Sequence, residues 1–232
     1  MPASQTIIRR LGHVRRRAFE LAGSERYSRT GALDIDRKLE RWVGFHGGFF
    51  VEAGANDGIN LSNTYFLERL RGWTGLLVEG IPDLARACAG HRPRSRVVQC
   101  ALVGPELDGG TVRMHYSNLQ SIVDGALPYE HVEAGAASQG EAPYAVDVPA
   151  RTLSSVLDDD PPARFDLLVL DVEGYEPHVL RGLDLDRHGP DFALIEVLDP
   201  GAGRAAIDAV LGDRYAEVDR LGPHDVLFQR AA

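Results

Sequence analysis

Short apolar runs alternate with segments of helical periodicity along most of this 232-residue chain. Runs of strand length lie at 48–53, 75–79, 96–101, 166–171, 192–198 and 225–229. Between them, apolar residues recur three and four positions apart, as on one face of a helix, at 62–71, 82–90, 175–182 and 203–212. Strands that alternate with helices are typical of βαβ units. The sequence therefore predicts a doubly wound α/β fold with a mostly parallel sheet.

The stretch from 104 to 150 interrupts this alternation. It is rich in glycine and proline and contains only two runs of strand character, at 111–117 and 144–151. A segment of this length is too long to be a simple connection. We predict an insertion on the sheet after the third strand, and we expect it to bind the acceptor substrate, because long loops more often carry function than packing.

The N-terminal segment, residues 1–30, differs from the remaining domain, residues 31–232, in its charge. Seven arginines and only two glutamates lie in residues 1–29, although the whole chain has a net charge of −9. Apolar residues recur there at helical spacing: Ile7, Ile8, Leu11, Val14, Ala18 and Leu21. This pattern predicts a basic amphipathic helix. We expect it to pack on the domain or on a second subunit of a homodimer, and an arm that binds a membrane or a polyanion is the alternative.

The overall composition argues against several classes of protein. A net charge of −9 disfavours a nucleic-acid binder, because phosphate contacts need clustered lysine and arginine. No apolar run is long enough for a transmembrane segment, and the chain lacks the features of a secretory signal, which favours a cytoplasmic location. Cys88 and Cys100 lack the spacing of a metal-thiolate site, so we expect buried thiols.

A glycine turn follows the first predicted strand. The segment reads FVEAGANDG at 50–58, and Glu79 ends the second predicted strand 21 residues after Gly58. In open α/β sheets, ligands bind beyond the carboxyl ends of the strands. Glycines let the backbone approach a ligand closely, and an acid about 20 residues further along accepts hydrogen bonds from both ribose hydroxyls. The spacing therefore predicts a ligand that contains a nucleoside.

The same turn departs from the dinucleotide pattern. Asn56 replaces the middle glycine of G-x-G-x-x-G, and Glu52 would repel a pyrophosphate. A positively charged amino-acid nucleoside fits better, because Glu52 can meet an ammonium group, and S-adenosylmethionine has that form. A nicotinamide-dependent oxidoreductase and a non-enzymatic nucleoside-binding module are the alternatives.

Several segments, in this order, resemble the FkbM-type methyltransferases, a family of S-adenosylmethionine-dependent O-methyltransferases with a Rossmann-like, seven-stranded methyltransferase fold. They are FVEAGANDG at 50–58, LLVEGIPDL at 76–84, RTLSSVL at 151–157, and FDLLVLDVEGYEPHVLRGL at 165–183, followed by ALIEV at 193–197. DVEGYE, at 171–176, is the most specific of these. One departure is that Gly80-Ile81-Pro82 replaces the proline that commonly follows the second-strand acid in the family.

The resemblance implies cofactor-binding roles for residues of these segments and methylation of a hydroxyl on a sugar or a sugar-bearing small molecule. The residues expected to bind the methionine end are Glu52, Gly54, Ala55 and Asn56. Those expected to hold the ribose and adenine are Glu79, Gly80, Ile81, Ala101 and Leu102. Apart from the resemblance, Asp171 is expected to position the sulfonium if Glu173 is the base.

The acceptor hydroxyl needs a group that removes its proton, because an alcohol is a poor nucleophile. Asp171 and Glu173, after a predicted strand, are candidate catalytic bases, and so is His115 in the insertion. Asp171 and Glu196 end strands that we expect to be neighbours, so a Mg²⁺ ion held by these two carboxylates is an alternative. We favour the general-base mechanism.

Overall fold

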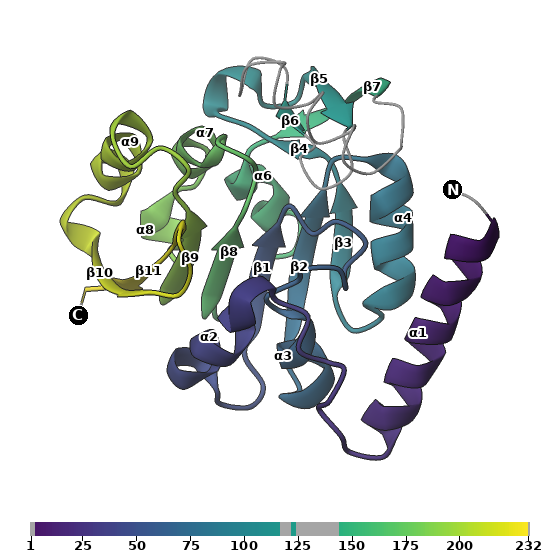
Figure 1. The fold of residues 1–232 in the computed structure, drawn as a ribbon. Helices are drawn as coiled ribbons and strands as arrows, with labels where there is room; N and C mark the ends of the chain where they lie inside the picture. The colour runs from purple at the N-terminus through teal and green to yellow at the C-terminus, as the bar shows by residue number, and fades with distance from the viewer. Residues whose placement is uncertain (1–2, 117–121, 124–143, 232) are drawn as a thin grey trace.

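The computed structural model describes residues 3–116, 122–123 and 144–231, with side chains for 12–116 and 144–231. A central sheet has helices on both faces, and a smaller sheet lies beyond one end of it (Figure 1). Within the described residues, no helix combines the length and the apolar character needed to span a bilayer.

The central sheet has seven strands in the order β10-β11-β9-β8-β1-β2-β3. Their bounds are β1 (Phe49–Ala53), β2 (Thr74–Glu79), β3 (Arg96–Gln99), β8 (Leu167–Leu170), β9 (Phe192–Glu196), β10 (Tyr215–Arg220) and β11 (Asp225–Arg230). The strands from β3 to β9 pair in parallel, and β11 is antiparallel to both of its neighbours. The predicted Rossmann-like sheet is confirmed. The strand order reverses direction between β1 and β8, and open α/β sheets bind ligands at such a point.

Helices cover both faces of this sheet. One face packs against α2 (Ile35–Val43), α3 (Tyr65–Leu70) and α4 (Pro82–His91), and the other against α6 (Leu153–Asp158), α7 (Glu176–Arg181), α8 (Leu185–His188) and α9 (Ala202–Leu211). Because side chains alternate along a strand, Phe50 joins the first of these cores and Val51 the second. Cys88 and Cys100 are free, buried thiols, as expected.

The predicted insertion builds the smaller sheet. This sheet has the order β4-β7-β5-β6, formed by β4 (Ala101–Leu102), β5 (Thr111–Tyr116), β6 (Ile122–Val123) and β7 (Tyr144–Arg151). Figure 1 shows it beyond the carboxyl ends of the central strands. Much of the segment that we expect to bind the acceptor, 117–121 and 124–143, lies outside the described residues.

The predicted N-terminal helix is α1 (Ala3–Leu21), which runs beside α4 in Figure 1. Glu20 anchors it to α3, because its carboxylate accepts hydrogen bonds from the Tyr65 hydroxyl at 2.8 Å and from Arg69 Nη2 at 3.1 Å. The helix therefore packs on the domain. The domain boundary at residue 30 and a homodimer stay predictions.

Candidate functional site

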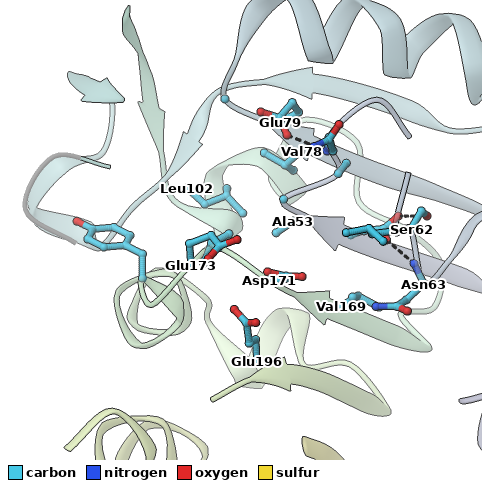
Figure 2. A pocket seen from close by; sticks show the side chains of 18 of the residues that line it. Ala53, Ser62, Asn63, Val78, Glu79, Leu102, Val169, Asp171, Glu173 and Glu196 are labelled. Atoms are coloured by element: carbon cyan, nitrogen blue, oxygen red, sulfur yellow. Dashed lines mark hydrogen bonds between the residues drawn. The ribbon is translucent and has the colours of Figure 1, made fainter. Parts of the chain in front are cut away.

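A cavity of about 410 Å³ opens at the carboxyl ends of β2, β1, β8 and β9 (Figure 2). Its volume is in the range of sites that bind small molecules. The predicted cofactor-binding residues that line it are Glu52, Gly54, Ala55, Asn56, Glu79, Gly80, Ala101, Leu102 and Asp171. Parallel strands thus bring together residues that are more than a hundred positions apart in sequence.

The glycine turn after β1 passes close to the end of β8. Gly54 has a φ of +81°, and a Cβ atom there would lie 1.8 Å from the carbonyl oxygen of Asp171. Only glycine satisfies both the backbone conformation and the close approach. Asn56 is also left-handed, with a φ of +49°, a conformation that asparagine tolerates better than most residues. The unusual composition of this turn follows from its geometry.

Glu79 is buried at the end of β2, with its carboxylate fixed by the backbone. Its two oxygens accept hydrogen bonds from the N–H groups of Asn56 and Ile81, each at 2.8 Å. Burial raises the pKa of Glu79, and the hydrogen bonds from Ile81, Asn56 and Gly80 oppose that rise. Each carboxylate oxygen keeps further lone-pair capacity. Glu79 can therefore accept hydrogen bonds from a pair of adjacent hydroxyls. Ile81 itself is a core residue outside the cavity lining, and it contributes through its N–H.

Glu52 lines the cavity, but both of its carboxylate oxygens bind the protein. One oxygen accepts hydrogen bonds from Ser62 Oγ at 2.8 Å and Thr64 Oγ1 at 2.6 Å. The other accepts from the Asn63 N–H at 3.0 Å, and Arg92 Nη1 lies 3.5 Å from the carboxylate. An ammonium group would compete with all of these contacts. The geometry thus supports a role for Glu52 in fixing the loop at 62–64 rather than as a direct ligand.

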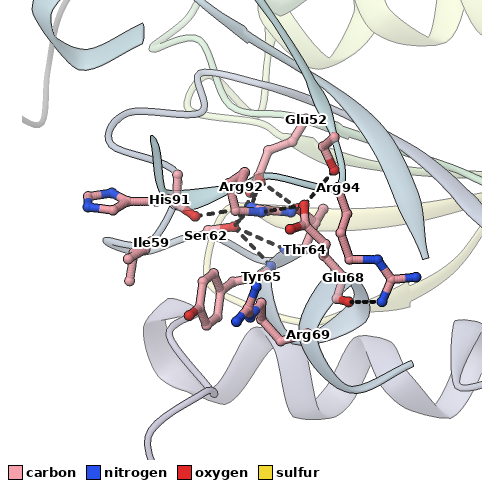
Figure 3. Close-up of polar contacts among 12 residues, drawn as sticks. Glu52, Ile59, Ser62, Thr64, Tyr65, Glu68, Arg69, His91, Arg92 and Arg94 are labelled. Carbon is pink, nitrogen blue, oxygen red and sulfur yellow. Dashed lines mark hydrogen bonds and ion pairs between the residues drawn. The ribbon is translucent and has the colours of Figure 1, made fainter. Parts of the chain in front are cut away.

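Arg92 is the centre of this buried network, shown in Figure 3. Its Nε donates to Glu68 Oε2 at 3.0 Å, and its Nη1 and Nη2 donate to the Gly58 carbonyl and to Thr64 Oγ1, at 3.0 and 2.9 Å. One guanidinium group thus faces two buried carboxylates, Glu52 and Glu68. It ties α4 to the loop that forms one wall of the cavity.

The DVEGYE segment forms a tight turn after β8. Buried Glu176 closes it, because its Oε1 accepts hydrogen bonds from the N–H groups of Val172 at 2.9 Å and Gly174 at 3.1 Å. Between them, Glu173 has a φ of +55° and lines the cavity. A left-handed glutamate is strained, and such strain concentrates at functional sites. Burial and the charges of Asp171 and Glu176 raise the pKa of Glu173 to about 8.

Asp171 and Glu196 form a carboxyl pair at the ends of neighbouring strands, β8 and β9, as predicted. Burial, with the charges of Glu176 and Asp225, raises the pKa of Asp171, while a hydrogen bond with Glu196 opposes the rise. Burial and the charge of Asp171 raise the pKa of Glu196. The pair therefore retains a proton near neutral pH. The side chain of Asp171 is open to the cavity.

Two of the predicted roles lack support in this geometry. Among the residues with described side chains, no three His, Cys, Asp or Glu groups are arranged to hold a metal ion, so a Mg²⁺ site at Asp171 and Glu196 is not supported. His115 is absent from the described lining of the cavity, whereas its neighbour Met114 is part of it. Successive residues of a strand point to opposite sides, so His115 in β5 faces away from the site.

The cavity also contains residues that the sequence analysis missed. Asp225 faces it from the start of β11, opposite Glu196 in the strand register. Because β11 is antiparallel, its first residue lies at the carboxyl ends of the other strands, and recognition of that reversal would have revealed Asp225. Leu33, in the short 3₁₀-helix Ala32–Asp34, and Leu61, in the loop after β1, also line the cavity, and neither segment has a distinctive sequence pattern.

Comparison with known proteins identifies a family. A family model described as the methyltransferase FkbM domain matches residues 52–220, a range that contains every predicted cofactor-binding and catalytic residue. Comparison with curated proteins gives no match.

Similar solved structures are distant. A TehB-like SAM-dependent methyltransferase from Corynebacterium glutamicum is 14% identical, with a TM-score of 0.44 and full coverage of both chains. The METTL16 MTase domain is 9% identical, with a TM-score of 0.49, over 86% of this chain and 66% of that one. A human methyltransferase 10 domain containing protein is 8% identical, with a TM-score of 0.44, over 85% and 81%.

Proposed function

The chain belongs to the FkbM methyltransferase family, and we propose that it uses S-adenosylmethionine to methylate a hydroxyl group of a sugar or a sugar-bearing small molecule. The charge of the cavity carries this proposal. The described lining contains no lysine or arginine. It contains six carboxyl groups, those of Glu52, Glu79, Asp171, Glu173, Glu196 and Asp225. Such a site attracts a cationic cofactor and repels a pyrophosphate. The same charge disfavours the nicotinamide-dependent alternative.

The residues of the cavity fit S-adenosylmethionine from one end to the other. Glu79 would accept hydrogen bonds from the ribose hydroxyls, and the apolar side chains of Ala101 and Leu102 would flank the adenine. Gly54 would line the methionine arm, and Asp171 would lie near the positive sulfonium. When bound, the cofactor supplies a methyl group activated by the sulfonium.

Glu173 would act as the general base in this proposal. Its raised pKa makes its carboxylate a stronger proton acceptor than an ordinary glutamate. It would take the proton of the acceptor hydroxyl while the oxygen bonds to the methyl carbon and the bond from that carbon to the sulfonium sulfur breaks. The products would be the methyl ether, S-adenosylhomocysteine and a protonated Glu173. The Glu176 hydrogen bonds hold the turn that positions Glu173.

The acidic lining favours an acceptor without phosphate or carboxylate groups. It supports a neutral sugar hydroxyl and disfavours nucleic acid as a substrate. A cytoplasmic location and a homodimer stay predictions from the sequence.

Replacement of Glu79 by alanine tests the cofactor assignment. We expect Glu79→Ala to weaken binding of S-adenosylmethionine and of its product, S-adenosylhomocysteine, by roughly 10- to 100-fold, because hydrogen bonds to a charged acceptor are lost. Calorimetry measures both affinities. Glu106→Ala is the matched control, because this exposed carboxylate pairs with Arg181 outside the cavity. Equal affinities in Glu79→Ala and the wild type would contradict the ribose assignment.

A further inference from the structure

Two leucines on the cavity are both exposed and strained. Leu33 is 62% exposed and Leu61 is 46% exposed, yet their φ angles are +50° and +59°. An exposed leucine alone needs no explanation. A leucine in the left-handed region is uncommon, because its Cβ crowds the backbone, and such strain persists where surrounding structure enforces it. Both leucines line the same cavity.

The two leucines belong to one wall. A backbone bridge pairs Gly31 with Leu61, so the segment before α2 runs beside the loop after β1. A Cβ atom on Gly222 would lie 3.2 Å from Ile35 Cδ1, which places the same segment beside the loop before β11. Ile35 and Pro223 also line the cavity. Four apolar residues therefore gather at this wall.

The part of this wall at Ile35 and Pro223 lies away from the proposed ribose site. Glu79 lies at the end of β2. Two strands, β1 and β8, lie between β2 and β9, and β11 is the next strand beyond β9. Three strand spacings separate β2 from β9 by about 14 Å. With adenosine at Glu79 and the reacting methyl group near Asp171 and Glu173, the end at β9 and β11 can take part of the acceptor, in addition to the insertion at 104–150 that we expect to bind it.

On the basis of the proposed function, we infer that the acceptor is an uncharged, amphiphilic glycoside, whose hydroxyl reaches Glu173 and whose apolar substituent packs on Leu33 and Leu61. The described lining offers no lysine or arginine to an anionic group. The two leucines give the cavity an apolar surface, although solvent exposure and the left-handed backbone both disfavour leucine at these positions. They determine specificity for the apolar part of the acceptor.

Asparagine substitutions separate this role from a structural one. Asparagine enters the left-handed region more readily than leucine, so Leu33→Asn and Leu61→Asn remove the apolar surface while they relieve strain. We expect their thermal stability to equal or exceed that of the wild type. Leu107→Asn is the control, because Leu107 is 39% exposed and lies outside the described cavity lining, in the short 3₁₀-helix Pro105–Leu107.

The test is calorimetric titration of the protein, saturated with S-adenosylhomocysteine, with methyl, hexyl and octyl β-D-glucosides below their micelle concentrations. In the wild type, we expect affinity to rise with chain length, by roughly 10-fold or more from methyl to octyl. Leu33→Asn and Leu61→Asn should each lower octyl glucoside affinity by about 10-fold and leave S-adenosylhomocysteine affinity unchanged. Leu107→Asn should change neither.

Equal affinities for the three glucosides, no binding of any of them, or wild-type octyl glucoside affinity in both leucine variants would overturn the inference. Each of these results leaves the proposed function intact if S-adenosylhomocysteine binds. Failure of S-adenosylhomocysteine to bind contradicts the proposed function itself, so the two failures are distinguishable.

Discussion

Replacement of Glu173 by glutamine will lower the rate of methyl transfer by about 10²- to 10⁴-fold, because the amide cannot accept the proton of the acceptor hydroxyl. The affinity for S-adenosylmethionine should change little. In the wild type, the rate should rise with pH through about 8, because burial and the charges of Asp171 and Glu176 raise the pKa of Glu173 to that value and only the ionised form is a base. Initial rates across this pH range, for the wild type and Glu173→Gln, check both statements.

Glu106→Gln is the control for this experiment, since Glu106 is an exposed carboxylate outside the described cavity lining. If Glu173→Gln keeps both the rate and the rise with pH, the proton passes to another group, and the pair of Asp171 and Glu196 becomes the candidate. EDTA tests the metal alternative in the same assay. We expect EDTA to leave the rate of methyl transfer unchanged. If EDTA abolishes activity and added Mg²⁺ restores it, these carboxylates hold a metal ion.

Arg92→Met will destabilise the protein by about 3–5 kcal/mol, because it leaves buried carboxylates without their counter-ion. Glu52 and Glu68 both face the Arg92 guanidinium, and Thr64 and the Gly58 carbonyl would lose its hydrogen bonds as well. Methionine replaces only the aliphatic stem of arginine, so the contacts of the guanidinium with the Phe50 and Tyr65 rings are lost as well. Urea unfolding, followed by circular dichroism, measures the loss.

Arg86→Met is the matched control, because Arg86 lies in α4, the helix that Arg92 follows directly, but is exposed and pairs with exposed Asp83. We expect a change within about 0.5 kcal/mol for this surface substitution. If Arg92→Met unfolds at the same urea concentration as the wild type, the buried network does not stabilise the wall of the cavity.

The central strands were predictable because parallel strands covered on both faces are nearly continuous apolar runs. β1, β2, β8 and β9 all have this character. β10 was missed because it is an edge strand with three charged residues in YAEVDR. The predicted strand at 96–101 is two strands in different sheets, β3 and β4, a change of partner that local composition does not reveal.

The helix α2 was overlooked, although Ile35, Leu39 and Val43 recur four residues apart and are buried. By contrast, α6 and α8 are short, with six and four residues, so they contain too few turns for periodicity to identify them.

Strand-end residues of the site were predictable for a geometric reason. Parallel strands end at one edge of the sheet, so Glu79, Asp171 and Glu196 had to lie along that edge. Arg92 could not be found in this way, because its importance comes from two carboxylates brought to it by tertiary packing. The strain at Leu33 likewise depends on backbone angles that the sequence does not show.

Calorimetric titration of the wild-type protein with S-adenosylmethionine and, separately, with NAD⁺ tests the central claim most directly. The carboxyl-lined cavity should bind S-adenosylmethionine at one site per chain, because its charge complements a cationic nucleoside. NAD⁺ should give no binding, because its pyrophosphate would face the same carboxylates. Tight binding of NAD⁺ without binding of S-adenosylmethionine would contradict the account.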